Sequence, residues 1–220
     1  MNLSHRLPST RGVRAALAVT VLAATHCSAP AASDDSGTEA TPEALLEEPS
    51  LAFGTWRSPA CEPVDETTFQ LRTYRIASNG VFADWERFAS PDCAAATKLY
   101  TLRMGGGSRL DRLSDVVKGA LEIRVFIDEK AILPTSAAGL ARVQAECPTV
   151  ALRVGVESDV TATGCGRIVP PRAACPVEYD LMKLGWKTLT FGDRAHTLCS
   201  DDTRPRSLSR WSVTFLHLGG

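Results

Sequence analysis

The chain has 220 residues, of which 44% are hydrophobic and 22% are charged, which are ordinary values for a soluble globular protein with one large domain or two small ones. Its formal net charge is −1, whereas nucleic-acid-binding proteins usually carry a basic face. Composition and charge therefore argue against a nucleic-acid partner.

Residues 1–26 are predicted to be a secretory signal peptide. Arg6, Arg11 and Arg14 precede an uncharged, mainly apolar run from Ala15 to Thr25. This run is too short for a permanent transmembrane helix, which needs about 20 residues. A buried core helix is the alternative, but the basic start and the position at the beginning of the chain favour a signal.

Cys27 follows the apolar run directly and is the predicted lipidation site. A cysteine at this place, followed by a polar segment, resembles the start of a bacterial lipoprotein, and its acyl chains would anchor the protein to a membrane of the cell envelope. His26 departs from the pattern, which usually has Gly, Ala or Ser before the cysteine. The alternative is plain secretion, or release into the periplasm, after cleavage near Ala29-Pro30-Ala31. Both alternatives make this an exported protein.

The other cysteines predict three disulfides. An even number of cysteines in an exported chain is typical of a disulfide framework. Zinc binding is less well supported because the sequence contains no C-x-x-C spacing, so no metal site is expected. The six residues concerned are Cys61, Cys93, Cys147, Cys165, Cys175 and Cys199.

Residues 27–50 are predicted to form a disordered acidic tether. They are rich in Ala, Ser, Thr, Pro, Asp and Glu and contain no aromatic residue, so they offer little surface for burial. From residue 51 to residue 220 no Pro/Gly/Ser-rich linker divides the sequence. This region is therefore predicted to be a single domain.

Most of this domain alternates apolar and polar residues, which predicts half-buried antiparallel strands. The alternation is clearest over residues 99–104, 121–127, 150–157 and 211–215. Asn79-Gly80 predicts a hairpin between residues 67–77 and 81–89, and residues 183–187 predict another. The apolar phase slips between Leu71 and Tyr74, which predicts a β-bulge.

Residues 135–147 have helical spacing instead. Leu140 and Val143 would share one face, Pro134 precedes the segment, and Ser136 can cap it. The predicted fold is mostly β: a curved antiparallel β-barrel or half-barrel, lipocalin-like in outline, with one short helix and disulfide staples. Sheets that close in this way often hold apolar ligands.

The sequence contains no recognisable catalytic motif. It lacks H-E-x-x-H, G-x-S-x-G and the phosphate-binding G-x-x-x-x-G-K, and only His196 and His217 fall within the predicted domain. An enzyme would need a pocket that joins one of these histidines to a carboxylate. The protein is therefore expected to be no enzyme and to need no cofactor.

A series of short motifs between residues 51 and 218 resembles the extracellular domain of the adenomatosis polyposis coli down-regulated family. That domain begins with G-x-W-x-S-x-x-C-E and continues with a tyrosine-containing strand, a D-P-x-C motif and a Y-x-L strand that runs into glycine. Here the motifs fall on Gly54, Trp56, Ser58, Cys61, Glu62, Tyr74, Asp92, Cys93, Tyr100, Leu102 and Gly105. The third motif is reordered, since this chain has Pro91-Asp92-Cys93. Residues 175–205 resemble the closing hairpin and glycine loop of the family.

The resemblance implies a curved antiparallel barrel with an apolar cavity suited to an acyl chain. The animal members of the family are membrane-anchored extracellular inhibitors of Wnt signalling. In this chain Gly54 and Trp56 would close one end of the barrel. The Gly-x-Trp spacing is also similar to the first strand of lipocalins, in which an arginine packs on the tryptophan, and Arg206 or Arg210 could do so here.

The resemblance also suggests a disulfide between Cys61 and Cys93, at the end of the first hairpin. Of the remaining cysteines, Cys165 and Cys175 would form the local pair. That choice leaves Cys147 to pair with Cys199, although six cysteines allow many other connectivities.

Strand pattern, resemblance and missing catalytic motifs together predict a binding domain for an apolar ligand, which would be a lipid, an acyl chain or a lipidated protein. The alternative is a structural or protein-interaction module of the cell envelope, with a filled core and an unidentified protein partner. The candidate pocket residues are the inward sets of the predicted strands: Phe69, Leu71, Tyr100, Leu102, Leu121, Ile123, Val125, Leu152 and Val154.

Overall fold

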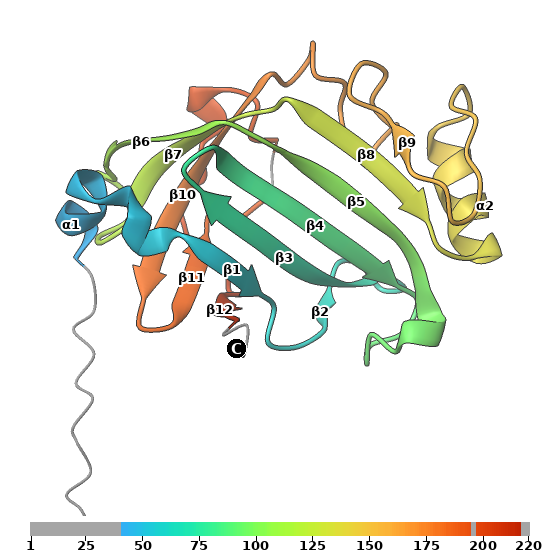
Figure 1. The fold of residues 1–220 in the computed structure, drawn as a ribbon, viewed down its shortest axis with the longest axis horizontal. Helices are drawn as coiled ribbons and strands as arrows, with labels where there is room; N and C mark the ends of the chain where they lie inside the picture. The colour runs from blue at the N-terminus through green and yellow to red at the C-terminus, as the bar shows by residue number, and fades with distance from the viewer. Residues whose placement is uncertain (1–40, 195–196, 217–220) are drawn as a thin grey trace, which may run out of the picture. The chain divides into compact units, whose positions relative to one another are not determined.

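The computed structural model describes residues 41–194 and 197–216, which fold around one antiparallel sheet (Figure 1). Its strands are β1 (Gly54–Arg57), β2 (Glu62–Pro63), β3 (Phe69–Ala77), β4 (Gly80–Phe88), β5 (Lys98–Gly106), β6 (Ser108–Leu113), β7 (Leu121–Phe126), β8 (Glu129–Pro134), β9 (Ser158–Asp159), β10 (Val177–Gly185), β11 (Thr188–Phe191) and β12 (Val213–Phe215). The helices are α1 (Pro42–Glu47) and α2 (Ala137–Glu146), with 3₁₀ turns η1 (Pro49–Ala52), η2 (Ala95–Thr97) and η3 (Asp201–Thr203).

The sheet is a curled half-barrel. Its described strands follow the order β6-β7-β10-β11-β12-β1-β3-β4-β5-β8-β9, and β2 pairs with β3 outside this path. We call β3, β4 and β5 the front wall and β7, β10 and β11 the back wall; Figure 1 shows the back wall behind the front one. The walls meet in the core, where the rings of Tyr74 and Phe191 have centroids 4.5 Å apart. The predicted mostly-β antiparallel half-barrel is confirmed.

Both predicted hairpins are present. β3 and β4 pair without interruption from Phe69–Phe88 to Ala77–Gly80. Gly80 has a φ of 137°, and a Cβ atom on it would lie 1.9 Å from the carbonyl oxygen of Gly106, so no other residue fits this turn. The second hairpin joins β10 to β11 at Trp186 and Lys187.

The predicted β-bulge in residues 67–76 is wrong. The register of β3 is continuous, and the apolar phase slips because a charged residue, Arg72, takes an inward position beside Tyr74 and Ile76. A register shift does occur one strand further, between β4 and β5 at Arg87 and Phe88.

The predicted strand over residues 150–157 is also wrong. Val156 N–H bonds back to the Arg153 carbonyl at 3.2 Å, and Gly155 has a φ of 76°, so this segment is a turn. Only the first half of the segment meets the core: Val150 packs against the core and Leu152 is buried, whereas Val154 and Val156 are 45% and 50% exposed. The alternating apolar residues therefore belong to a loop, of which only Val150 and Leu152 contact the core.

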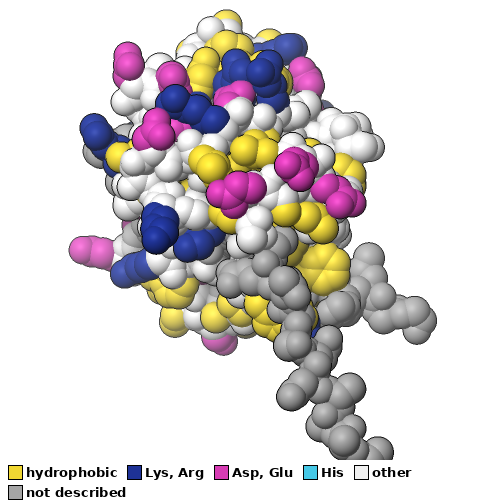
Figure 2. Space-filling model, turned by 90° about the vertical axis from the view of Figure 1, so that its left-hand side faces the viewer, with side chains coloured by type: hydrophobic (Ala, Val, Ile, Leu, Met, Phe, Trp, Pro, Cys, Tyr) yellow, Lys and Arg dark blue, Asp and Glu magenta, His cyan; other side chains and the backbone are white. Residues whose placement is uncertain are grey.

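The folded region begins before residue 51, which corrects the predicted extent of the tether. Thr41 caps α1, with its hydroxyl accepting from Ala44 N–H at 3.2 Å, and Leu45 is only 1% exposed in the core. Seen from the α1 side, Figure 2 shows basic, acidic and apolar side chains interspersed over this face. The predicted signal peptide, Cys27 and residues 27–40 lie outside the described residues.

The predicted helix is confirmed as α2. Ser136 caps it by accepting from Gly139 N–H at 3.1 Å, and Val143 is fully buried. No helix within residues 41–194 and 197–216 is long and apolar enough to cross a membrane.

Gly54 and Trp56 are the residues that were expected to close one end of the barrel. They lie on β1, which pairs with β12 on one side and β3 on the other. A Cβ atom on Gly54 would lie 2.3 Å from the ring of Phe215, and this ring packs edge-on against Trp56 with centroids 5.0 Å apart. Phe215 therefore takes the place expected for an arginine, while Arg210 stacks on Trp211.

Three disulfides join the six cysteines of the described region: Cys61–Cys93, Cys147–Cys165 and Cys175–Cys199. The first confirms the prediction, and the other two correct it. Nearby contacts hold the same segments together. Beside Cys147–Cys165, Arg167 forms an ion pair with Glu146 at the end of α2. Beside Cys175–Cys199, Tyr179 N–H of β10 donates to the Leu198 carbonyl. Such disulfides indicate an oxidising environment, extracellular or periplasmic.

Candidate functional site

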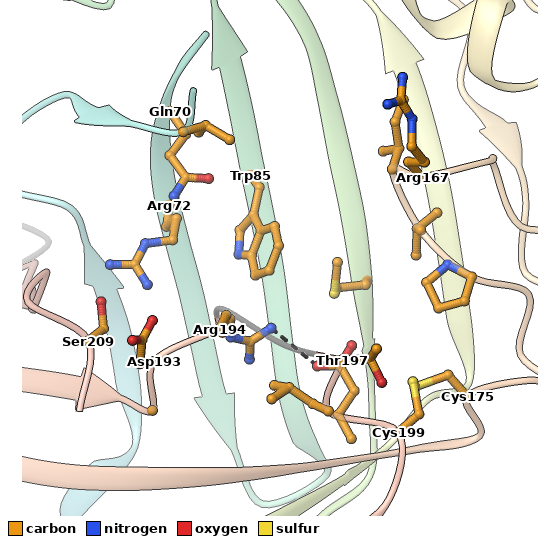
Figure 3. A pocket seen from close by; sticks show the side chains of 18 of the residues that line it. Gln70, Arg72, Trp85, Arg167, Cys175, Asp193, Arg194, Thr197, Cys199 and Ser209 are labelled. Atoms are coloured by element: carbon orange, nitrogen blue, oxygen red, sulfur yellow. Dashed lines mark hydrogen bonds and ion pairs between the residues drawn. A yellow bond between two sulfur atoms is a disulfide. The ribbon is translucent and has the colours of Figure 1, made fainter. Parts of the chain in front are cut away.

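A cavity of about 780 Å³ opens between the front and back walls of the half-barrel (Figure 3). The front wall supplies Gln70 and Arg72 from β3, Trp85 and Arg87 from β4, and Met104 from β5. The rest of the lining comes mainly from β2, β10 and loops: Glu62, Pro63, Val64, residues 166–170, Ala174, Cys175, Glu178, residues 192–194, residues 197–199, Ser209 and Trp211.

Strand pairing explains why the front-wall side chains share one surface. Residues opposite each other in antiparallel strands point to the same face of the sheet. Arg72 lies opposite Trp85, and Gln70 lies opposite Arg87. These polar side chains therefore form one patch on the concave face, immediately beside the apolar core.

The candidate pocket residues from the sequence do not line this cavity. Six of them are buried core residues: Tyr100, Leu102, Leu121, Ile123, Val125 and Leu152. Val125 alone touches a hollow, a separate small one next to Tyr74 and Phe191. Phe69 and Leu71 are half-buried on the other face of β3, and Val154 is exposed. Most of these residues do lie on the inward face of the sheet, but they fill the core, and the cavity lies next to the core rather than within it.

Arg72 and Glu62 form a buried ion pair at one side of the cavity. Arg72 Nε lies 2.8 Å from Glu62 Oε2, and the two side chains are 5% and 1% exposed. Ser58 and Gln70 also donate hydrogen bonds to this carboxylate, at 2.5 and 3.1 Å. Although burial opposes it, the neighbouring Tyr74 and Glu62 hold the pKa of Arg72 above its usual value. Glu62 is thus fully engaged by protein donors.

Arg194 forms a second internal ion pair, with the back wall. Its Nη2 lies 2.7 Å from Asp180 Oδ2, and its Nη1 lies 3.3 Å from Glu178 Oε2. Asp180 also accepts from the N–H groups of Leu181 and Gly192, at 2.8 and 3.0 Å. Burial disfavours the charge of Arg194, but Asp180, Glu178 and Tyr74 together outweigh this effect and raise the pKa of Arg194.

Trp85 lies next to two guanidinium groups. The Cζ atoms of Arg194 and Arg87 lie 5.0 and 5.7 Å from its ring centroid, within the range of cation–π attraction. Figure 3 shows Trp85 rising from β4 with Arg194 beside its indole. The apolar indole and the two cations therefore line the same part of the cavity.

Apolar groups complete the lining. Met104 and Trp85 lie on the front wall, Ile168, Val169 and Leu198 lie on loops, and the Cys175–Cys199 disulfide borders the same space. The cavity is consequently amphipathic rather than purely apolar as the sequence suggested.

No metal or catalytic centre stands out in the described residues. They contain no group of three or more His, Cys, Asp or Glu side chains that could hold a metal ion. His196 and His217, the histidines considered for catalysis, lie outside the described residues. The arrangement can bind and orient a molecule through hydrogen bonds, charge and apolar contact.

A scan against protein-family models found no model that matches this chain, and a search of curated proteins found no matching sequence. The resemblance to the adenomatosis polyposis coli down-regulated family rests on its motifs and stays a prediction.

Proposed function

We propose that this protein is a non-enzymatic, exported binding module that holds a small molecule with an apolar body in the cavity between its two walls. The cavity itself carries the proposal. Its volume of about 780 Å³ lies within the range of natural small-molecule sites, and its lining combines apolar side chains with a few directed polar groups.

Because of the family resemblance, an acyl chain, either free or attached to a protein, is a candidate ligand. Met104, Ile168 and Leu198 offer contact to such a chain. A structural module with a filled core is the competing function, and an open cavity of this size in the half-barrel argues against it.

Export and anchoring form the second part of the proposal. The N-terminal signal pattern and the three disulfides support export, and the position of Cys27 after the apolar run supports acylation. The intact mass of the protein extracted from its membrane tests this directly. Acyl groups on Cys27 are the expected result; an unmodified N-terminus beyond residue 27 would indicate plain secretion.

Native mass spectrometry and the uptake of a fluorescent fatty acid test ligand binding. The variant Ala174→Trp places an indole in the cavity and is expected to reduce uptake at least about tenfold, equivalent to about 1.4 kcal/mol. Ala138→Trp, on the exposed start of α2, is the matched control and should leave uptake unchanged. Absence of any bound or captured amphiphile in the wild-type protein would refute the proposed function.

A further inference from the structure

We propose that Arg87 and Trp85 form an anion subsite in the cavity, so that the preferred ligand is an amphiphile with a carboxylate head group. This inference rests on the proposed function and names the class of ligand for the same cavity.

Arg87 is distinguished from the other arginines of the cavity by its lack of a counter-ion. Three of the four described arginines that line the cavity are paired: Arg72 with Glu62, Arg194 with Asp180, and Arg167 with Glu146. The Nε and Nη1 atoms of Arg87 are buried and have no hydrogen-bond partner among the described residues. A guanidinium group can only donate hydrogen bonds, so these atoms need an acceptor.

The neighbours of Arg87 do not supply that acceptor. Gln70 lies opposite it on β3, and its amide nitrogen donates to Glu62, but its amide oxygen accepts no hydrogen bond from Arg87 Nε or Nη1. Tyr100 lies opposite it on β5, and burial raises the pKa of the Tyr100 phenol, which keeps that group neutral. Burial likewise lowers the pKa of Arg87, as expected for a cation removed from water.

Trp85 adds a further donor of the same kind. Its Nε1 atom is buried and lacks a hydrogen-bond partner among the described residues, and the indole N–H can only donate. The Cζ atom of Arg87 lies 5.7 Å from the indole centroid, so the unpaired donors belong to adjacent groups. Adjacent donors with no acceptor favour a ligand atom that carries negative charge.

A carboxylate fits this arrangement better than a neutral head group. The planar guanidinium fork matches the two oxygens of a carboxylate, and such charge-assisted hydrogen bonds are stronger than neutral ones. The apolar side chains of Met104 and Ile168 line the same cavity and are available to the tail of the ligand.

The test compares three amphiphiles that share one tail: decanoate, decan-1-ol and decyltrimethylammonium. Isothermal titration calorimetry, below the micelle concentration of the two ionic compounds and the solubility limit of the alcohol, gives the dissociation constants for the wild-type protein. We expect decanoate to bind at least about tenfold more tightly than the alcohol, a difference of about 1.4 kcal/mol, and the ammonium compound to bind most weakly. This comparison uses only the wild-type protein, so its result does not depend on whether a variant folds.

Arg87→Met then locates the selectivity. It removes an unpaired buried cation, so the variant should fold, and it should bind decanoate and decan-1-ol with similar affinities. Arg109→Met removes an exposed arginine of β6, outside the cavity, and should keep the wild-type preference. The Nε–H resonance of Arg87 provides an independent measurement and should shift on addition of decanoate but not of the alcohol.

The outcomes separate the two proposals. If the alcohol and the ammonium compound bind as tightly as decanoate, the anion subsite is refuted and the binding function stands. The subsite is also refuted if Arg87→Met keeps the preference for decanoate. If none of the three amphiphiles binds, the proposed function itself fails, and the inference about Arg87 fails with it.

Discussion

Arg72 Nε and Glu62 Oε2 lie 2.8 Å apart in an ion pair that is almost completely removed from solvent, and Glu62 directly follows the disulfide-bonded Cys61. The pair holds β2 to β3 at the border of the cavity. A buried pair of this kind is costly to break, because removal of one partner leaves the other charge unpaired in the interior.

Glu62→Gln is therefore expected to lower the free energy of unfolding by about 3–5 kcal/mol, since Arg72 keeps its charge and loses its counter-ion. Chemical denaturation followed by tryptophan fluorescence measures the change. The double variant Glu62→Leu/Arg72→Met removes both charges and should be far less destabilised than Glu62→Gln alone. Equal losses in the two variants would show that the ion pair is not the source of the effect.

The disulfide Cys175–Cys199 borders the cavity, whereas Cys147–Cys165 ties the end of α2 to a loop. Replacing either pair by serines is expected to cost about 2–5 kcal/mol of unfolding free energy, since each closes a loop of the unfolded chain. Only Cys175→Ser/Cys199→Ser should also weaken decanoate binding, because it frees the segment that carries Leu198. If both double variants bind decanoate with similar affinity, the Cys175–Cys199 disulfide is not needed to hold the ligand.

The sequence predicted the fold well wherever one face of a strand is buried and the other is solvated. That condition holds for β3, and the hairpins that join β3 to β4 and β10 to β11 were found from their turn residues. The prediction failed over residues 150–157, where Gly155 turns the chain with a positive φ and only Val150 and Leu152 contact the core. Alternation in sequence cannot distinguish such a loop from a strand without knowledge of its pairing.

The cavity was harder to predict because two of its main features run against simple rules. Inward positions were assumed to be apolar, so Arg72 was interpreted as a break in the pattern rather than as an inward residue. Its spacing of two from Tyr74 was the signal that could have revealed it. The loop segments 166–170, 192–194 and 197–199 have no periodicity, so their position on the other side of the cavity depends on long-range contacts and on the disulfides.

Gly139 provides a sharp test of the packing of α2 on β5. An alanine in a helix is usually more stable than a glycine by about 1 kcal/mol. Here a Cβ atom would lie 1.7 Å from the carbonyl oxygen of Leu99, so Gly139→Ala should instead lower the unfolding free energy by about 1–3 kcal/mol. Gly107→Ala, whose Cβ would have no neighbour within 4 Å, should change it by less than about 0.5 kcal/mol. A stabilised Gly139→Ala variant would contradict the close contact.

Asp65 is expected to make stability depend on pH in the acid range. Burial opposes its ionisation, but hydrogen bonds from Thr67 and the charge of Arg142, 3.2 Å away, outweigh it and hold the pKa of Asp65 below its usual value of 3.8. Folding therefore favours the ionised form. Its contribution is complete above pH 3.8 and is lost as the pH falls through the lower pKa of the folded state.

Asp65→Asn removes this charge while its amide oxygen can still accept from Thr67 N–H. The side chain is 47% exposed, so solvent screening limits the expected loss to about 0.5 kcal/mol between pH 5 and 7. Urea denaturation at a series of pH values should show the gap between wild type and variant closing below pH 3.8. Asp202→Asn, at an exposed position of η3, is the control and should change the unfolding free energy by less than about 0.5 kcal/mol. A gap that widens as the pH falls would mean that the protonated form of Asp65 is the one that the fold stabilises.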